Sequence, residues 1–344
     1  MENHPYYTNN ILELKIKTVG KKSSRNLKDG GYIKARVVDI LQPSTLSVVM
    51  VVELLEPVEQ DQDRFGPGPG PQQLILKMYD RRFSPHLREE INAGGSATRE
   101  TETKFVNFLD EDRMPGFFTL YQNAAGFVNN LFWSTAQKEA YLALFAADMN
   151  RSEVLAYDHL VHLQGDAVPV FHADVQLALR SAPDQSSHPL AGVEGVLLDY
   201  IPGFPMTELG DKVPEKEWPA ICDQAIEKVN KIIDLPFINH DMVLRNTIVS
   251  GGEGGGQYKV YYIDFAMCDF RSEFDPDEIW RERKRRADEE GKIGFYLSSC
   301  LSVARIEKAK KRYEGRDAPD PPPPGWKFMP SNLFAGKAMK LPDA

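Results

Sequence analysis

Short runs of apolar and β-branched residues recur along the chain, and each has the length of a β-strand bounded by polar or turn-forming residues. The segments with this pattern are 32–40, 46–56, 73–77, 195–200 and 259–263. The first four predict a small antiparallel sheet. The fifth, KVYYI, follows the Gly- and Ser-rich stretch SGGEGGGQ, which predicts a hairpin turn joining two strands.

A helical spacing of apolar residues replaces the strand pattern in four other segments. They are 101–112, 134–149, 152–165 and 211–233. Ser134 and Gln137 predict a capping box at the start of the second segment, and Gly165 predicts the end of the third. The first two segments fall between residues 80 and 150, so we expect that region to be an ordered helical insertion rather than a linker.

The two ends of the chain differ in composition from its middle. Residues 1–30 are expected to form a polar lead-in. Residues 313–344 are proline-rich and are expected to be extended rather than packed. The folded part is therefore expected to lie between residues 31 and 312.

Three polar residues near the fifth strand have the spacing of a phosphoryl-transfer site. Asp241 is followed five positions later by Asn246, and Asp264 ends the apolar run that precedes it. One carboxylate can receive the proton of an attacking hydroxyl, while an amide oxygen and a second carboxylate hold magnesium against nucleotide phosphates. The spacing matches the kinase pattern H-R-D-x-x-x-x-N followed by D-F-G. We therefore expect Asp241 to be catalytic and Asn246 and Asp264 to bind the metal.

The order of the remaining motifs resembles that of protein kinases. LKMYDRRF carries Lys77 at the place of the kinase strand lysine, and Glu153 opens the third helical segment, where kinases have the glutamate that pairs with that lysine. Glu139 is the alternative partner. GVLLDYIPG resembles the hinge of kinases, which implies nucleotide contacts at Asp199, Tyr200 and Ile201.

As a set, these motifs resemble a family of fungal proteins with divergent protein-kinase-like domains, over roughly residues 31–310. The resemblance implies an α+β protein-kinase-like bilobed fold. Its first lobe, at 31–200, would hold the small antiparallel sheet and the insertion, and its second, at 201–312, would be mainly helical and shortened. It also implies that ATP and Mg²⁺ bind in the cleft and that phosphate passes to a hydroxyl acceptor, either a protein or a small molecule.

Several positions depart from the kinase pattern. Asn239 stands where kinases have a histidine, and Ala266 replaces the glycine of D-F-G. The expected phosphate-covering loop, LQPSTLS, has no glycine, so only the Ser44 and Thr45 hydroxyls or backbone N–H groups are available to approach phosphate. These departures keep a second hypothesis open, in which the chain is a pseudokinase that binds a nucleotide or a protein without turnover.

Composition and net charge narrow the kinds of partner and the cellular location that we expect. The net charge of −9 argues against a nucleic-acid partner, because nucleic-acid-binding domains are usually basic. No apolar run approaches the length of about 20 residues that spans a bilayer, so no membrane partner is expected. Three cysteines without close spacing predict reduced thiols and an intracellular location, cytoplasmic or nuclear.

Overall fold

A computed structural model describes residues 5–42, 45–55, 73–111, 113–114, 116–117, 119, 133–178, 188–251 and 257–312, with side chains to residue 302. The chain divides into two compact units. Unit 1 comprises Met1–Val154 and Val170–Tyr200, and unit 2 comprises Leu155–Pro169 and Ile201–Ala344. The assignment of these units as the two lobes of a kinase-like fold remains a prediction.

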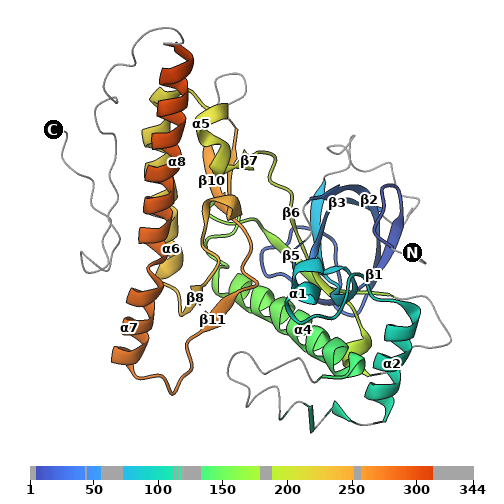
Figure 1. Cartoon of the computed structure of the whole chain (residues 1–344). Coiled ribbons are helices and arrows are strands. Elements are labelled where there is room, and N and C mark those ends of the chain that lie inside the picture. The colour runs from blue at the N-terminus through green and yellow to red at the C-terminus, as the bar shows by residue number, and fades with distance from the viewer. Residues whose placement is uncertain are drawn as a thin grey trace. The chain divides into compact units, whose positions relative to one another are not determined.

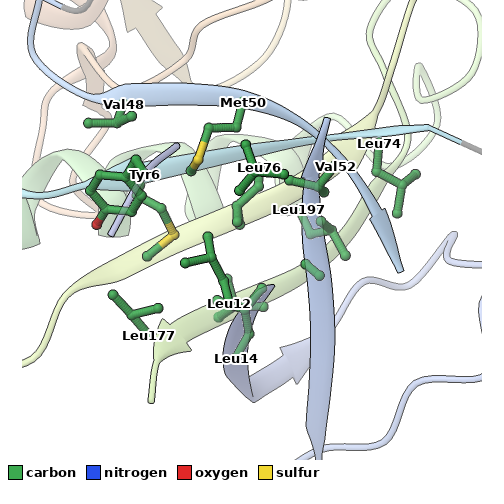
Figure 2. Close-up of a cluster of buried hydrophobic side chains, with 14 of the residues drawn as sticks. Tyr6, Leu12, Leu14, Val48, Met50, Val52, Leu74, Leu76, Leu177 and Leu197 are labelled. Carbon is green, nitrogen blue, oxygen red and sulfur yellow. The ribbon is translucent and has the colours of Figure 1, made fainter. Parts of the chain in front are cut away.

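The strands of unit 1 close into a barrel with the order β1-β2-β3-β4-β6-β5, and every pairing in it is antiparallel (Figure 1). The strands are β1 (Ile11–Val19), β2 (Tyr32–Leu41), β3 (Val48–Leu55), β4 (Leu74–Tyr79), β5 (Phe171–Leu177) and β6 (Glu194–Asp199). Because side chains alternate across a strand, every second residue points into the barrel. Figure 2 shows this interior, which is filled by aliphatic side chains and Met50 and reached by Tyr6 from the N-terminal segment.

Strand β1 lies in the segment that was expected to be a polar lead-in, so that expectation is wrong for residues 11–19. Leu12, Leu14 and Ile16 are buried in the barrel, while the residues between them face outward. The strand pairs with β2 on one side and with β5 on the other. It therefore closes the predicted small antiparallel sheet into a barrel.

The helices of unit 1 follow β4 in the chain. They are the 3₁₀ turn η1 (Arg81–Phe83), α1 (Pro85–Glu90), α2 (Arg99–Asp110) and α4 (Thr135–His159), and a short 3₁₀ turn η3 (Pro189–Ala191) precedes β6. Helices are thus present between residues 80 and 150, and their description as an insertion in a kinase-like lobe remains a prediction. A cluster containing Phe105, Phe108 and Ala143 packs α2 against α4.

Helix α4 is a single element of 25 residues, whereas the sequence predicted two helices. The predicted capping box begins it: the backbone N–H of Ser134 donates to Gln137 Oε1 at 2.9 Å, and that of Gln137 donates to Ser134 Oγ at 3.3 Å. No glycine or proline follows until Gly165, so nothing interrupts the helix near Ser152. The unit boundary between Val154 and Leu155 falls inside α4.

Unit 2 is mainly helical and carries two small sheets. Its helices are α5 (Leu209–Lys212), α6 (Trp218–Ile233), α7 (Asp277–Ala287) and α8 (Glu289–Arg312), and its 3₁₀ turns are η4 (Met206–Glu208), η5 (Glu215–Glu217) and η6 (Leu244–Asn246). Its strands are β7 (Phe204–Pro205), β8 (Phe237–Asn239), β9 (Thr247–Ser250), β10 (Lys259–Tyr262) and β11 (Cys268–Phe270). Strands β9 and β10 pair antiparallel, as the predicted hairpin requires, and residues 252–256 of its predicted turn lie outside the described residues. Helices α6 and α8 lie side by side (Figure 1).

The mixture of helices and antiparallel sheets agrees with the expected α+β class. Among the residues that the structure describes, no helix is long and apolar enough to cross a membrane.

Candidate functional site

The lysine of β4 and the glutamate of α4 form the buried ion pair that the sequence predicts. Leu74, Leu76 and Met78 point into the barrel, so Lys77 and Tyr79 face outward. Lys77 Nζ lies 3.1 Å from Glu153 Oε2, with 7% of the lysine side chain and none of the glutamate side chain exposed. The Tyr79 hydroxyl also donates to Glu153, so this carboxylate receives two donors from one strand.

Glu139, the alternative partner of Lys77, binds two arginines instead. Its Oε1 accepts from Arg88 Nη2 at 2.7 Å, and its Oε2 accepts from Arg81. Glu139 and Glu153 are fourteen residues apart on one helix, which is about 21 Å along its axis. The two carboxylates therefore serve different ends of α4, and only Glu153 reaches the lysine.

The expected hinge residues lie at the end of β6, where the chain leaves unit 1. Asp199 is already engaged within unit 1: its N–H donates to the Val170 carbonyl at 2.9 Å, and its Oδ1 lies 2.7 Å from His172 Nε2. Tyr200 is the last residue of unit 1, and Ile201 is the first of the following segment of unit 2. The expected nucleotide contacts of these three residues remain a prediction.

The expected phosphate loop is only partly described. Thr45 lies between β2 and β3 and is half-buried, whereas Ser44 lies outside the described residues. Contacts of either residue with phosphate stay predictions.

Asp241 and Asn246 are joined by two hydrogen bonds within unit 2. The amide Nδ2 of Asn246 donates to Asp241 Oδ2 at 2.9 Å and to the Asp241 carbonyl at 3.0 Å. Turn η6 brings the two residues together, since it carries the chain from Asp241 back to the start of β9. Asn246 donates both of these hydrogen bonds from its amide nitrogen, so its amide oxygen does not take part in the contact with Asp241. The other Asp241 oxygen, Oδ1, accepts from Arg245.

Asn239 connects Asp241 to Asp264. Its Oδ1 accepts from the backbone N–H of Asp241 at 2.9 Å, and its Nδ2 donates to the Asp264 carbonyl at 3.0 Å. A second tie runs from the Ile263 N–H to the Asn246 carbonyl at 2.9 Å. The three residues that the sequence picked out therefore belong to one hydrogen-bonded assembly inside unit 2.

The backbone at Asp264 has an unusual conformation. Its φ of +66° lies in the left-handed region, which aspartate tolerates better than most residues. The next residue, Phe265, is fully buried and meets Tyr157 edge-on at 5.6 Å and Phe237 at 6.2 Å between ring centroids. Because Phe265 is buried against these two rings, its packing holds the adjacent turn at Asp264 in place.

Two charged residues of α7 and α8 support the strand that carries Asn239. Glu289 is buried, and its Oε1 accepts the backbone N–H of Asn239 at 2.8 Å. Lys284 Nζ donates to the carbonyls of Ile233, at 2.8 Å, and of Phe237, and lies 3.5 Å from Glu289 Oε2. Burial raises the pKa of Glu289, although the positive charge of Lys284 acts in the opposite direction. Burial lowers the pKa of Lys284.

In the described part of the chain, no three His, Cys, Asp or Glu side chains cluster in a way that would hold a metal ion by themselves. Mg²⁺ commonly binds through one or two protein ligands, with phosphate oxygens and water completing its octahedron. The oxygen donors of Asn246 and Asp264 are of the type that this ion prefers.

Comparison with known proteins gives a partial match. No protein-family model matches the chain. Over 75 residues, 22% of this chain, it is 28% identical to the KEOPS complex subunit Bud32 of Pyrococcus abyssi, strain GE5 / Orsay. The match covers 31% of that relative, so the chain spans less than a third of its length. It supports a distant relationship with the kinase-like superfamily and carries no information on the fungal family.

The sequence did not reveal the parts played by Asn239, Tyr79 and Glu289. Asn239 was noted only as a departure from the kinase histidine, although an amide at that place can both donate and accept. Tyr79 could have been found from its position two residues after Lys77, on the same face of the strand. Glu289 gave no local signal, because its partner is fifty residues away in the chain.

Proposed function

We propose that the chain is an ATP- and Mg²⁺-dependent phosphotransferase of the kinase-like type. Asp241 would orient the acceptor hydroxyl and take its proton, and Asn246 and Asp264 would hold the metal. Lys77, fixed by Glu153, would bind nucleotide phosphates in unit 1. The bound metal would neutralise charge on the transferring phosphoryl group. The acceptor, a protein or a small molecule, stays open.

The observation that carries this proposal is the orientation of Asn246. Its amide nitrogen donates twice to Asp241, which leaves the amide oxygen as the atom for a hard cation. The same contact holds the Asp241 carboxylate in a defined direction, as a general base requires. Asn239 extends this arrangement to Asp264. The distant similarity of one segment to Bud32 points to the same superfamily.

One contact favours the second hypothesis, a pseudokinase without turnover. The guanidinium of Arg245 binds Asp241 Oδ1, and with Asn246 on Oδ2 both carboxylate oxygens already have donors. An acceptor hydroxyl must then displace or share one of them. If Arg245 stays in place, the assembly would bind a nucleotide without transferring its phosphate.

Thermal unfolding with ATP, with and without Mg²⁺, tests the binding half of the proposal. A ligand at about 100 times its Kd stabilises the folded state by about 2.7 kcal/mol. For a unit of this size that raises the Tm by about 5–11 °C. Asp264→Asn should abolish the magnesium-dependent part, because an amide cannot replace the carboxylate's charge. Asp223→Asn, an exposed position on α6, is the matched control and should keep the full shift.

Turnover is tested by Asp241→Asn. This change should leave the nucleotide-dependent shift in Tm nearly intact and remove ATP hydrolysis and phosphate transfer, since it acts on the transition state more than on binding. Equal rates for the wild type and Asp241→Asn, together with an intact shift in Tm, would establish the pseudokinase. Absence of any shift in Tm with nucleotide would reject the phosphotransferase and would leave only a pseudokinase that binds a protein.

A further inference from the structure

The hairpin formed by β1 and β2 carries a charge opposite to that of the whole chain. Residues 11–41 contain eight Lys and Arg against three Asp and Glu, a net charge of +5 within a chain of −9. A local field of this kind acts on a partner at short range, because screening limits the influence of distant charges to about 8–10 Å. The average charge of the chain therefore does not describe this surface.

The outward face of the hairpin presents an aromatic ring between cations. Lys15 is the cross-strand partner of Tyr32, and Glu13 is the partner of Lys34. The intervening residues of both strands point into the barrel, so Lys15, Tyr32 and Lys34 point to solvent. Tyr32 is 62% exposed, so its ring is accessible to a ligand. Ring and cations thus share one rigid face of a closed barrel.

The loop between β1 and β2 carries further exposed lysines. Lys22 and Lys28 are exposed on it. The loop is fastened to the barrel: the Gly20 N–H donates to the His172 carbonyl at 2.8 Å, and Ser23 Oγ lies 3.1 Å from His172 Nδ1. The Gly30 N–H donates to the Ile16 carbonyl at 2.9 Å. Because the loop is held in place, little conformational entropy is lost when a ligand binds there.

The four lysines of this face differ from other basic residues of the hairpin. Lys17 pairs with Asp174 and Glu194, and Arg36 pairs with Glu53. Within the described residues, no ion-pair partner lies against Lys15, Lys22, Lys28 or Lys34. Their charges are available to an external anion. We name Lys15, Lys22, Lys28, Tyr32 and Lys34 the hairpin face.

We propose that the hairpin face binds single-stranded nucleic acid, with Tyr32 stacking on a base and the four lysines contacting backbone phosphates. An exposed aromatic platform set among cations is the combination that sequence-independent single-strand binders use. An acidic protein segment would use the lysines but gain little from the ring. This inference departs from the expectation of no nucleic-acid partner that the total charge suggested, and it is independent of the proposed phosphotransferase.

Fluorescence anisotropy of the full chain with a labelled oligouridylate of about 15 nucleotides tests the proposal. We expect a Kd of about 1–100 µM at physiological salt. Each neutralised phosphate contributes about −0.7 to the slope of log K against log salt, so four lysines give a slope of about −2.8. The double change Lys15→Gln with Lys34→Gln should reduce its magnitude by about 1.4. The control, Lys104→Gln on α2, should leave it unchanged.

The aromatic contact is tested separately. Tyr32→Ala should weaken binding by about 5- to 150-fold, while Tyr32→Phe should retain it, because stacking needs the ring and not the hydroxyl. Tyr296→Ala, an exposed tyrosine on α8, is the matched control. Circular dichroism should show the same fold for all variants. Affinity that is unchanged in the lysine double variant or in Tyr32→Ala would overturn the proposal. So would binding to phosphatidylserine vesicles in place of the oligonucleotide.

Discussion

Removal of the lysine from the buried Lys77–Glu153 pair should destabilise unit 1 strongly. Glu153 is fully buried and Lys77 is 7% exposed, so Lys77→Met leaves a buried carboxylate without the lysine, while the Tyr79 hydroxyl still donates to it. Loss of one partner of a buried ion pair costs about 3–5 kcal/mol. For a unit of this size, that corresponds to a fall of about 6–20 °C in its Tm.

A second substitution should reverse most of this loss. In Lys77→Met with Glu153→Gln, neither member of the pair carries a charge, and the glutamine oxygen can still accept from Tyr79. Replacing both members of a buried pair is often neutral, so the double variant should unfold close to the wild type. It should nevertheless lack nucleotide-dependent stabilisation, because the cation for the phosphates is gone. The pair would then be shown to serve function rather than stability.

Differential scanning calorimetry is the appropriate assay, because it measures the Tm and the enthalpy of unfolding directly. The control is Lys104→Met, which breaks an exposed ion pair with Glu100 on α2 and should leave the Tm nearly unchanged. A Lys77→Met variant within about 1 kcal/mol of the wild type would refute the reasoning, since the pair would then be solvated and not buried.

Three further predictions concern α4 and the support of the assembly that holds Asp241, Asn246 and Asp264. Ser134→Ala should cost about 1 kcal/mol of unfolding free energy through loss of the cap, whereas Ser152→Ala, in the middle of the helix, should cost nothing; a loss at Ser152 would mean that a separate helix starts there. Asn239→Ala removes the side-chain hydrogen bonds to the Asp241 N–H and the Asp264 carbonyl, so we expect about 2–4 kcal/mol of destabilisation in urea unfolding. The increase in Tm with Mg·ATP should also be smaller, and an unchanged increase would contradict the positioning role of Asn239. Glu289→Gln tests pH dependence. Burial raises the pKa of Glu289, so its contribution to stability is full below about pH 4.3 and is lost as pH rises through the folded pKa. The wild type should therefore lose stability relative to Glu289→Gln as the pH rises above about 4.3, and a flat difference would exclude this cause.

Local patterns predicted the parts of the fold that depend on neighbours in the chain. The strand at Lys77, the hairpin of β9 and β10, and the cap at Ser134 each follow from a few adjacent residues. The ion pair was also predictable, because the resemblance to kinases pairs Lys77 with Glu153 and an unpaired lysine in a desolvated site is costly. The sequence alone left Glu139 as the alternative partner.

The barrel could not be predicted in the same way. Leu12, Leu14 and Ile16 alternate with polar residues, so β1 was readable as a strand, but its composition suggested a polar lead-in. Its pairing with β5 joins Leu14 to Leu177, which are far apart in sequence, and no local signal specifies that contact. Likewise, Ser152 followed by Glu153 imitates a helix start, and only continuous packing along α4 shows that the helix runs through it.

Asn239 illustrates how a departure from a motif can preserve its physical role. The position requires one group that accepts from the Asp241 N–H and another that donates to the Asp264 carbonyl. A neutral imidazole offers one acceptor and one donor, but it loses the acceptor when it is protonated near its ordinary pKa of about 6.5. An amide offers the same two functions from a shorter side chain and does not titrate. The link between the two aspartates therefore persists across the pH range in which a histidine would weaken it, and the absence of the histidine is by itself no argument against catalysis.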